Sequence, residues 1–188
     1  MARPPLRAVS LDLVYRWAEL GRSHSLANAD LRETWLDDRD LAGADLQSAD
    51  LSGAPCPRVN LNRANLAGAE AQGAIFYAAK LEGANLAGAN LTGAVLERAK
   101  LAGADLRGAT LVLAELANAK LPGADLRDAD CSQADLRRAD LRGARLEGAA
   151  LEHAHLRGAK LDGAAYDEHT SWPPGFDPAA LGARQAAG

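Results

Sequence analysis

Residues 81–110 read LEGANLAGANLTGAVLERAKLAGADLRGAT, and a leucine stands at every fifth position of this stretch. The same phase runs from Leu26 to Tyr166, where 24 of the 29 positions spaced five residues apart are Leu. Two residues before these positions, 25 of 29 residues are Ala. A five-residue period fits neither the 3.6-residue period of an α-helix nor the two-residue alternation of a strand. The sequence therefore indicates a solenoid of short structural repeats.

Each unit of the repeat combines a short extended side with a corner. In extended chain, residues two apart point to the same side, so the Ala and the Leu of a unit both face inward and the residue between them faces outward. Fourteen units carry Gly directly before the next Ala, as at Gly83 and Gly103. Glycine adopts the positive φ of a tight corner at little cost.

The composition agrees with a narrow core. The 188-residue chain is 48% apolar but only 4% aromatic, so small and aliphatic side chains must fill the interior, as in a solenoid. It has 21 basic and 25 acidic residues and a net charge of −4, which neither demands nor excludes a charged partner. No stretch approaches the roughly 20 apolar residues of a membrane span, and Asp12 and Arg16 interrupt the apolar N-terminal segment. We expect a cytoplasmic protein that does not bind membranes.

Several units carry a recognisable signature. Ala44-Asp45-Leu46, Ala84-Asn85-Leu86 and Ala124-Asp125-Leu126 resemble the A-[DN]-L-x-x units of the pentapeptide-repeat family, and the resemblance covers about three quarters of the chain. It implies an all-β fold, a right-handed quadrilateral parallel β-helix with four units in each coil and about seven coils. Coils stacked at the usual strand spacing would form a rod about 35 Å long.

The chain divides into three expected regions. Residues 1–25 form an N-terminal capping segment, in which a helix begins at Ser10 and ends at Gly21. Residues 26–166 form the β-helix, and residues 167–188 form a C-terminal cap whose aromatic residues cover the last coil, with a loose tail from 179 to 188. Caps are needed because the open ends of a β-helix would pair with other chains. The apolar face of the expected helix consists of Leu6, Leu13, Trp17 and Leu20.

Thr34 and Arg39 occupy inward positions in the first coil. An unpaired arginine inside the core is costly. We therefore expect either a distorted first coil or an Arg39 side chain that turns outward.

Four units per coil place outward residues 20 apart in vertical ladders. One ladder is apolar and forms the predicted interaction face, since a run of exposed apolar groups marks a contact surface. Its residues are Trp35, Pro55, Ile75 and Val95, with Tyr77 beside them. We expect this face to bind a protein partner or a second copy of the chain. Two alternatives remain: the N-terminal helix or a terminal tail covers the face, or the first coil is too irregular for Trp35 to align with the other residues.

Other ladders carry charge. Lys80, Lys100, Lys120 and Lys160 form a basic ladder, which marks a site for an acidic partner or is a solvated face neutralised by Glu82 and Asp162. Direct nucleic-acid binding is not expected, because no aromatic side chains interleave for base stacking. Two acidic ladders consist of Asp30, Asp50 and Glu70, and of Asp45, Asp105 and Asp125. Because some members of the family mimic DNA, the resemblance implies an alternative function, a DNA gyrase or topoisomerase-binding protein that protects against topoisomerase inhibitors.

No catalytic, cofactor or metal site is expected. His153 and His155 face outward without a third ligand nearby, and the acid-base residues 167–169 lie in the expected cap. Cys56 and Cys131 occupy inward positions as buried thiols on different sides of the rod. We therefore predict a non-catalytic scaffold that presents its outer surface to an unidentified protein partner.

Overall fold

From residue 25 to residue 164 the chain repeats one conformation every five residues. In each unit the N–H of the inward Ala donates to the C=O of the preceding Leu, as from Ala84 to Leu81 at 3.1 Å. This hydrogen bond closes a four-residue turn from Leu to Ala, and the third residue of the turn has a positive φ. This holds both for glycines, such as Gly83 (65°), and for other residues, such as Arg98 (59°). This combination is the type II β-turn, so each corner of the rod is one such turn.

The Asp or Asn of the repeat starts the next corner. In the Asn85 unit, the side-chain Oδ1 accepts a hydrogen bond from the N–H of Ala87 at 3.1 Å, and Asp50 does the same with Ser52 at 2.9 Å. Such Asx-turns hold the chain in the bent conformation that follows. The preference for Asp or Asn before the central Leu therefore has a local structural cause.

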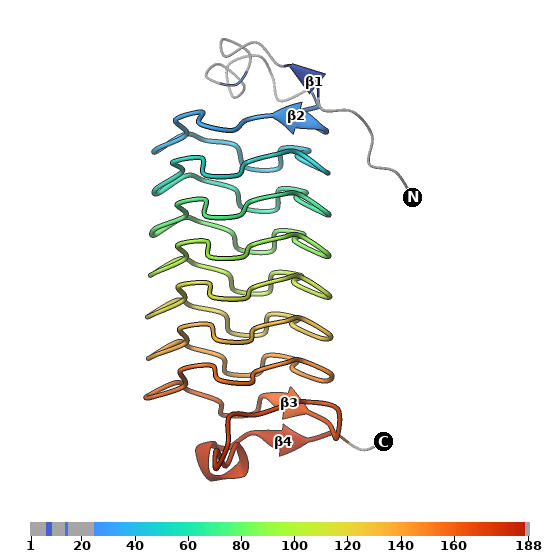
Figure 1. Ribbon diagram of the computed structural model, residues 1–188, viewed down its shortest axis with the longest axis vertical. Helices are drawn as coiled ribbons and strands as arrows, with labels where there is room; N and C mark the ends of the chain where they lie inside the picture. Colours follow the sequence, from blue (N-terminus) through green and yellow to red (C-terminus); the bar gives the residue numbers. More distant parts are fainter. Residues whose placement is uncertain (1–6, 9–13, 15–24, 187–188) are drawn as a thin grey trace.

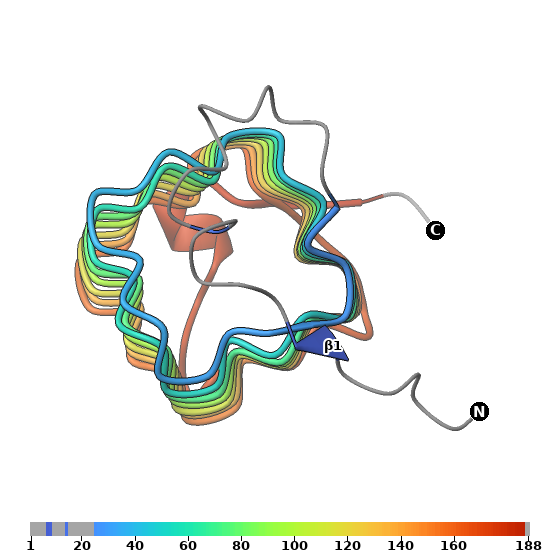
Figure 2. The ribbon, with the colours of Figure 1, turned by 90° about the horizontal axis from the view of Figure 1, so that it is seen from above.

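Parallel β-bridges join residues 20 apart and stack the coils into a rod (Figure 1), as in the series Asp45, Asn65, Asn85. Bridges occur at four positions in each coil, as at 40, 45, 50 and 55, so the coil has four sides (Figure 2). The N–H of Leu66 donates to the C=O of Asn85 at 2.7 Å, and the N–H of Asn85 donates to the C=O of Ala64 at 2.9 Å. Four units thus complete one coil, as predicted; the number of about seven coils stays a prediction.

The core is a continuous column of inward side chains from Leu26 to Ala164. Phe76, Cys56 and Cys131 fill positions in this column and are at most 1% exposed. Burial raises the pKa of both cysteine thiols to about 12, so at neutral pH they are protonated and pack as small apolar groups. Thr34 is buried, whereas the Arg39 side chain is exposed and only its backbone follows the repeat. The outward turn of Arg39 is therefore the correct alternative.

The computed structural model describes residues 7–8, 14 and 25–186. At the N-terminal end of the rod, strand β1 (Arg7–Ala8) pairs in parallel with β2 (Ala29–Asp30). Val14 is 1% exposed and belongs to the core. The predicted helix rests on residues that lie outside the described ones, namely Leu6, Ser10, Leu13, Trp17, Leu20 and Gly21, so it stays a prediction.

The other end of the rod has a cap of aromatic residues. Tyr166, Trp172 and Phe176 pack against the core, with the Tyr166 and Trp172 rings edge to face at 5.7 Å and the Trp172 and Phe176 rings stacked at 5.2 Å. The Thr170 hydroxyl donates to the C=O of Leu146 at 2.8 Å and holds the segment against the last regular coil.

The prediction of a loose tail from 179 is wrong for residues 179–186. After the 3₁₀ helix η1 (Ala179–Leu181), strand β4 (Arg184–Gln185) pairs in parallel with β3 (Ala165–Tyr166). The N–H of Arg184 donates to the C=O of Ala164 at 2.7 Å, and the N–H of Ala186 donates to that of Tyr166 at 2.7 Å. The open edge of the last coil supplies these acceptors, and the tail closes the edge by pairing with it.

Candidate interaction face

The predicted apolar ladder forms in register on one side of the rod. Parallel bridges join Pro55 to Ile75 and Ile75 to Val95, and the N–H of Leu36 donates to the C=O of Pro55 at 2.8 Å, which places Trp35 next in the series. Trp35 is 66% exposed and Ile75 is 40% exposed, while Pro55 and Val95 are half-buried. Strands β3 and β4 lie at the opposite end of the rod (Figure 1), so the tail from 179 to 186 does not cover the ladder.

Polar groups flank the apolar ladder at the adjoining corner. The Arg98 guanidinium lies 5.9 Å from the centre of the Tyr77 ring, within cation–π range. One coil earlier, Arg58 holds Asp38 through two hydrogen bonds of 2.8 and 2.6 Å. Tyr77 is half-buried, and it widens the apolar strip at the coil of Ile75.

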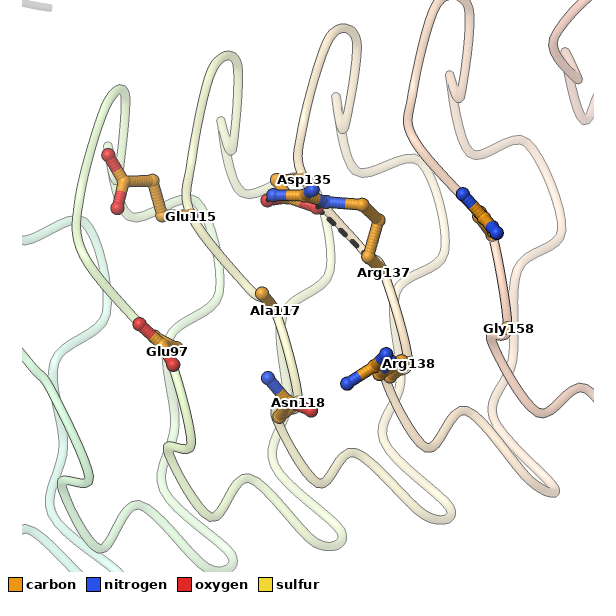
Figure 3. Close-up of a pocket in the computed structure, with 9 residues that line it drawn as sticks. Glu97, Glu115, Ala117, Asn118, Asp135, Arg137, Arg138 and Gly158 are labelled. Atoms are coloured by element: carbon orange, nitrogen blue, oxygen red, sulfur yellow. Dashed lines mark hydrogen bonds and ion pairs between the residues drawn. The ribbon is translucent and has the colours of Figure 1, made fainter.

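The same side of the rod becomes polar after Val95. Bridges continue the ladder through Glu115, Asp135 and His155. Here the surface holds an arginine groove of about 560 Å³ beside the small residues Ala117 and Gly158 (Figure 3). We use "interaction face" for the apolar ladder, Tyr77 and this groove together. The groove is lined by Glu97, Glu115, Ala117, Asn118, Asp135, Arg137, Arg138, Arg157 and Gly158.

Charge is unevenly compensated in the arginine groove. Arg137 donates to Asp135 at 2.8 and 2.6 Å, and these hydrogen bonds lower the pKa of Asp135 below its ordinary value. Arg138 and Arg157 are exposed, and neither forms an ion pair within residues 25–186. The exposed Glu115 also forms no ion pair within residues 25–186, so the groove offers two cations at one end and one carboxylate nearer the apolar ladder.

One acidic ladder is interrupted by Asn65 and Asn85, whereas Asp30, Asp50 and Glu70 follow one another on successive coils. Arginines pair with several of these carboxylates. An arginine binds the carboxylate two residues before it in three units. Its Nε donates to Oδ1 and its Nη2 donates to Oδ2, at 2.6 to 2.9 Å. The carboxylates are those of Asp30, Asp105 and Asp125. These bidentate contacts lower the pKa of Asp105 and Asp125. The Asp-Leu-Arg spacing is visible in the sequence, yet its meaning was missed, because it depends on the Arg side chain folding back across the corner.

The remaining acidic positions are also bound by neighbours. Asp45 accepts from the Ser25 hydroxyl at 2.7 Å and from the Asn65 amide at 3.1 Å. The Arg32 guanidinium lies 3.8 Å from Asp50, and the Gln72 amide donates to Glu70 at 2.5 Å. Ser25, Asn65 and Gln72 are neutral donors that leave the charge of Asp45 and Glu70 in place, and Arg32 is shared by Asp30 and Asp50, so the ladder Asp30, Asp50 and Glu70 keeps a net negative charge.

The basic ladder is exposed and in register. Bridges join Lys80 to Lys100 and Lys100 to Lys120, and the ladder continues through Asp140 to Lys160. Within the part of the chain that the structure describes, Lys80, Lys100 and Lys120 form no ion pair, so Glu82 does not neutralise them. Asp140 is instead held by Arg142 at 2.7 Å. The lysines form a row of like charges.

The described residues, 7–8, 14 and 25–186, contain neither a metal cluster nor a membrane-spanning helix. No group of three His, Cys, Asp or Glu residues there is arranged to hold a metal ion, including the region of His153 and His155. No helix there is both long and apolar enough to span a membrane.

The repeat geometry matches a known sequence family. The model of pentapeptide repeats matches in 8 copies, over residues 25–55, 60–98, 74–112, 89–128 and 129–164. The chain belongs to the pentapeptide-repeat family. The right-handed quadrilateral β-helix, which the resemblance implies, is the fold of this family. Comparison with curated protein sequences gave no match.

Solved pentapeptide-repeat structures are similar to parts of the chain. Rfr23 from the cyanobacterium Cyanothece 51142 is 38% identical with a TM-score of 0.49, and the match covers 50% of this chain and 63% of Rfr23. HetL from Nostoc sp. strain PCC 7120, which is involved in heterocyst differentiation regulation, is 37% identical with a TM-score of 0.42 over 72% of this chain and 71% of HetL. QnrB1, a plasmid-mediated fluoroquinolone resistance protein, is 13% identical with a TM-score of 0.38 over 81% of this chain and 91% of QnrB1.

Proposed function

We propose that this pentapeptide-repeat protein is a non-catalytic scaffold that binds a partner protein through its interaction face. The observation that carries the proposal is the exposed, in-register apolar ladder, in which Trp35 is 66% and Ile75 40% exposed. The corresponding ladders on the other three sides carry Asp, Glu, Asn, Lys, Arg and Thr, and their apolar members are Ala150 and Ala165 at the far end of the rod. A contiguous apolar strip on an otherwise polar surface is typical of a protein contact site.

A rigid rod suits this role. The backbone N–H and C=O of Ile75 are both hydrogen-bonded to the preceding coil, with donation to Ala54 at 3.0 Å and acceptance from Cys56 at 2.9 Å, and Val95 is bonded in the same way to Ala74 and Phe76. Little backbone entropy is then lost when a partner binds. In this proposal about seven coils set the length of the surface, and the segment 1–25 closes one end.

The test is a double variant on the interaction face. Ile75→Asp with Val95→Asp should abolish capture of the partner from cell extract, because binding would then bury two carboxylates. Asn90→Asp with Thr110→Asp is the matched control, since it adds the same charge to successive coils of a neighbouring side. Equal capture by both variants, with unchanged thermal unfolding, would refute the proposal. Sedimentation velocity on the same variants tests whether the partner is a second copy of the chain.

The alternative function is that of a DNA-mimicking protein that binds DNA gyrase or topoisomerase. Such a surface needs a continuous acidic stripe along the rod. Asn65 and Asn85 interrupt one acidic ladder, and Arg107 and Arg127 compensate its later carboxylates. The other ladder, Asp30, Asp50 and Glu70, ends after three coils at Asn90 and Thr110. We therefore place this function second. Protection or inhibition of gyrase supercoiling at stoichiometric protein, in the presence of a fluoroquinolone, would reverse the order.

A further inference from the structure

We propose that the partner contributes an amphipathic α-helix of about 20 residues that lies along the rod on the interaction face. Its apolar side chains contact the apolar ladder, and acidic side chains at one of its ends contact Arg138 and Arg157. The inference rests on the proposed function, because it names the kind of segment that the same face binds. It follows from the backbone bonding of the face, the spacing of its ladder and the position of its unpaired charges.

At Ile75 and Val95 the interaction face offers side chains to a partner but no free backbone N–H or C=O groups. The N–H of Val95 donates to Ala74 at 2.9 Å, and its C=O accepts from Phe76 at 2.8 Å. Ile75 is bonded in the same way to Ala54 and Cys56. A strand laid on this side would find no backbone partners for its own N–H and C=O groups, whereas a helix bonds these groups internally.

The spacing of the ladder also favours a helix. Three coil steps, from Trp35 to Val95, cover about 14 Å at the usual strand spacing. Three helical turns cover about 16 Å, which is only about 2 Å more than the three coil steps. A helix with one contact residue per turn therefore stays in register with a ladder that has one residue per coil. An extended segment presents a side chain to the same side about every 6.7 Å, and after three steps it is more than one coil out of register.

The charges of the arginine groove give the helix a direction. Arg138 and Arg157 line the groove two and three coils beyond Val95, at its end away from the apolar ladder. On the other side of the groove, Glu97 lies 3.5 Å from Arg98 and is already paired. Trp35 and Arg157 are about six coils apart, or about 29 Å, which corresponds to a helix of about 20 residues. Carboxylates in its last turns would complete the ion pairs that the arginines lack.

A second copy of the chain does not fit this face. A twofold axis along the rod would place Arg138 and Arg157 against the same arginines of the other copy. A twofold axis across the rod and in the plane of the face, centred between the two halves, would place the apolar ladder of one copy against the polar half of the other. The same axis centred on Ile75 would pair the ladders but leave Arg138 and Arg157 of both copies without a partner. Isologous contacts need a self-complementary surface, and none of these arrangements provides one.

Two displayed peptide libraries test the inference against the whole protein. The first is a 20-residue helical scaffold with one face randomised, and the second has the same length but carries prolines that prevent helix formation. We expect binders from the helical library only. They should carry aliphatic or aromatic residues on successive turns and Asp or Glu at one end. Binders from the proline library alone, or from neither, would overturn the inference.

A charge swap then tests the predicted direction on a selected peptide. Arg138→Glu with Arg157→Glu should weaken binding about tenfold, and replacing the acidic residues of the peptide by Lys should restore it. Binding to the unaltered protein should also weaken as salt is raised, which needs no variant. If the affinity of the selected helices changes neither with the charge swap nor with the salt concentration, the inference is overturned.

The outcomes separate this inference from the proposed function. If capture of the natural partner depends on Ile75 and Val95 while no charge-dependent helix is selected, the face binds a protein but not a helix of this kind. If capture and peptide binding are both insensitive to Ile75→Asp with Val95→Asp, the proposed function and this inference fail together.

Discussion

At the scale of single residues, the corners hold the clearest local strain in the rod. Fourteen corner residues with positive φ are not glycine, among them Ala78 at 53° and Leu113 at 59°. The left-handed conformation costs an ordinary residue roughly 1–2 kcal/mol, and Asn or Asp tolerates it better than Leu or Ala. Glycine at the same position, as in Gly93 at 63°, avoids this cost.

Replacing such residues by glycine should stabilise the rod. Leu113 is 55% exposed, so Leu113→Gly loses little packing, and we expect it to raise the free energy of unfolding by up to about 1 kcal/mol. Gly93→Ala is the reciprocal control, because its Cβ would meet no atom within 4 Å and only the conformational cost remains. Denaturant unfolding measures both; a loss of stability in Leu113→Gly would contradict the strain argument.

The Asp-Leu-Arg pairs act at the same scale and predict a pH effect. Hydrogen bonds from Arg127 lower the pKa of Asp125 in the folded protein. The pair therefore stabilises the fold above the unfolded pKa of Asp, about 3.9, and this contribution is lost as the pH falls through the lower, folded pKa. In Arg127→Ala, carboxyl NMR titration should find the Asp125 pKa closer to its ordinary value. An unchanged pKa would mean that the pair is not formed in solution.

At the scale of elements, each ladder is a column of side chains whose chemistry repeats at the coil spacing. The amide of Asn85 donates to Asn65 at 3.1 Å, and that of Asn65 donates to Asp45 at 3.1 Å, so one side is held by a chain of hydrogen bonds. The basic ladder has the opposite character, since like charges directly opposite each other destabilise a sheet.

A single charge reversal in the basic ladder should therefore stabilise the rod. Lys100→Glu places a carboxylate between Lys80 and Lys120, and we expect a gain of about 0.2–1 kcal/mol in the free energy of unfolding. The gain should shrink in 1 M salt, where exposed charges are screened. A loss of stability at low salt would show that the lysines are already compensated.

The closing strand β4 is the other element with a testable role. Deleting residues 179–188 removes its hydrogen bonds to Ala164 and Tyr166 and reopens the edge of β3. We expect faster amide hydrogen exchange in the last coil and concentration-dependent self-association, with exchange in the coils around Ile75 unchanged. A monomer with an intact last coil would mean that the aromatic cap alone closes this end.

At the scale of the whole molecule, the period of five predicts nearly everything that repeats. The Leu and Ala positions place the core and every corner, because one phase persists without a slip. The features that do not repeat cannot be predicted from the period. Arg184 and Gln185 have no apolar pattern, and they form a strand only because β3 offers an open edge. The arginine groove likewise depends on Ala117 and Gly158 standing beside longer side chains on adjoining coils.

The central claim is that the interaction face binds a partner protein. Isothermal titration calorimetry with the purified partner tests it most directly, on the unaltered protein, on Ile75→Asp with Val95→Asp, and on the control Asn90→Asp with Thr110→Asp. We predict that the face variant weakens binding at least about 100-fold, as the loss of two central contacts does, and that the control changes it less than about threefold. Equal dissociation constants for all three proteins would contradict the account.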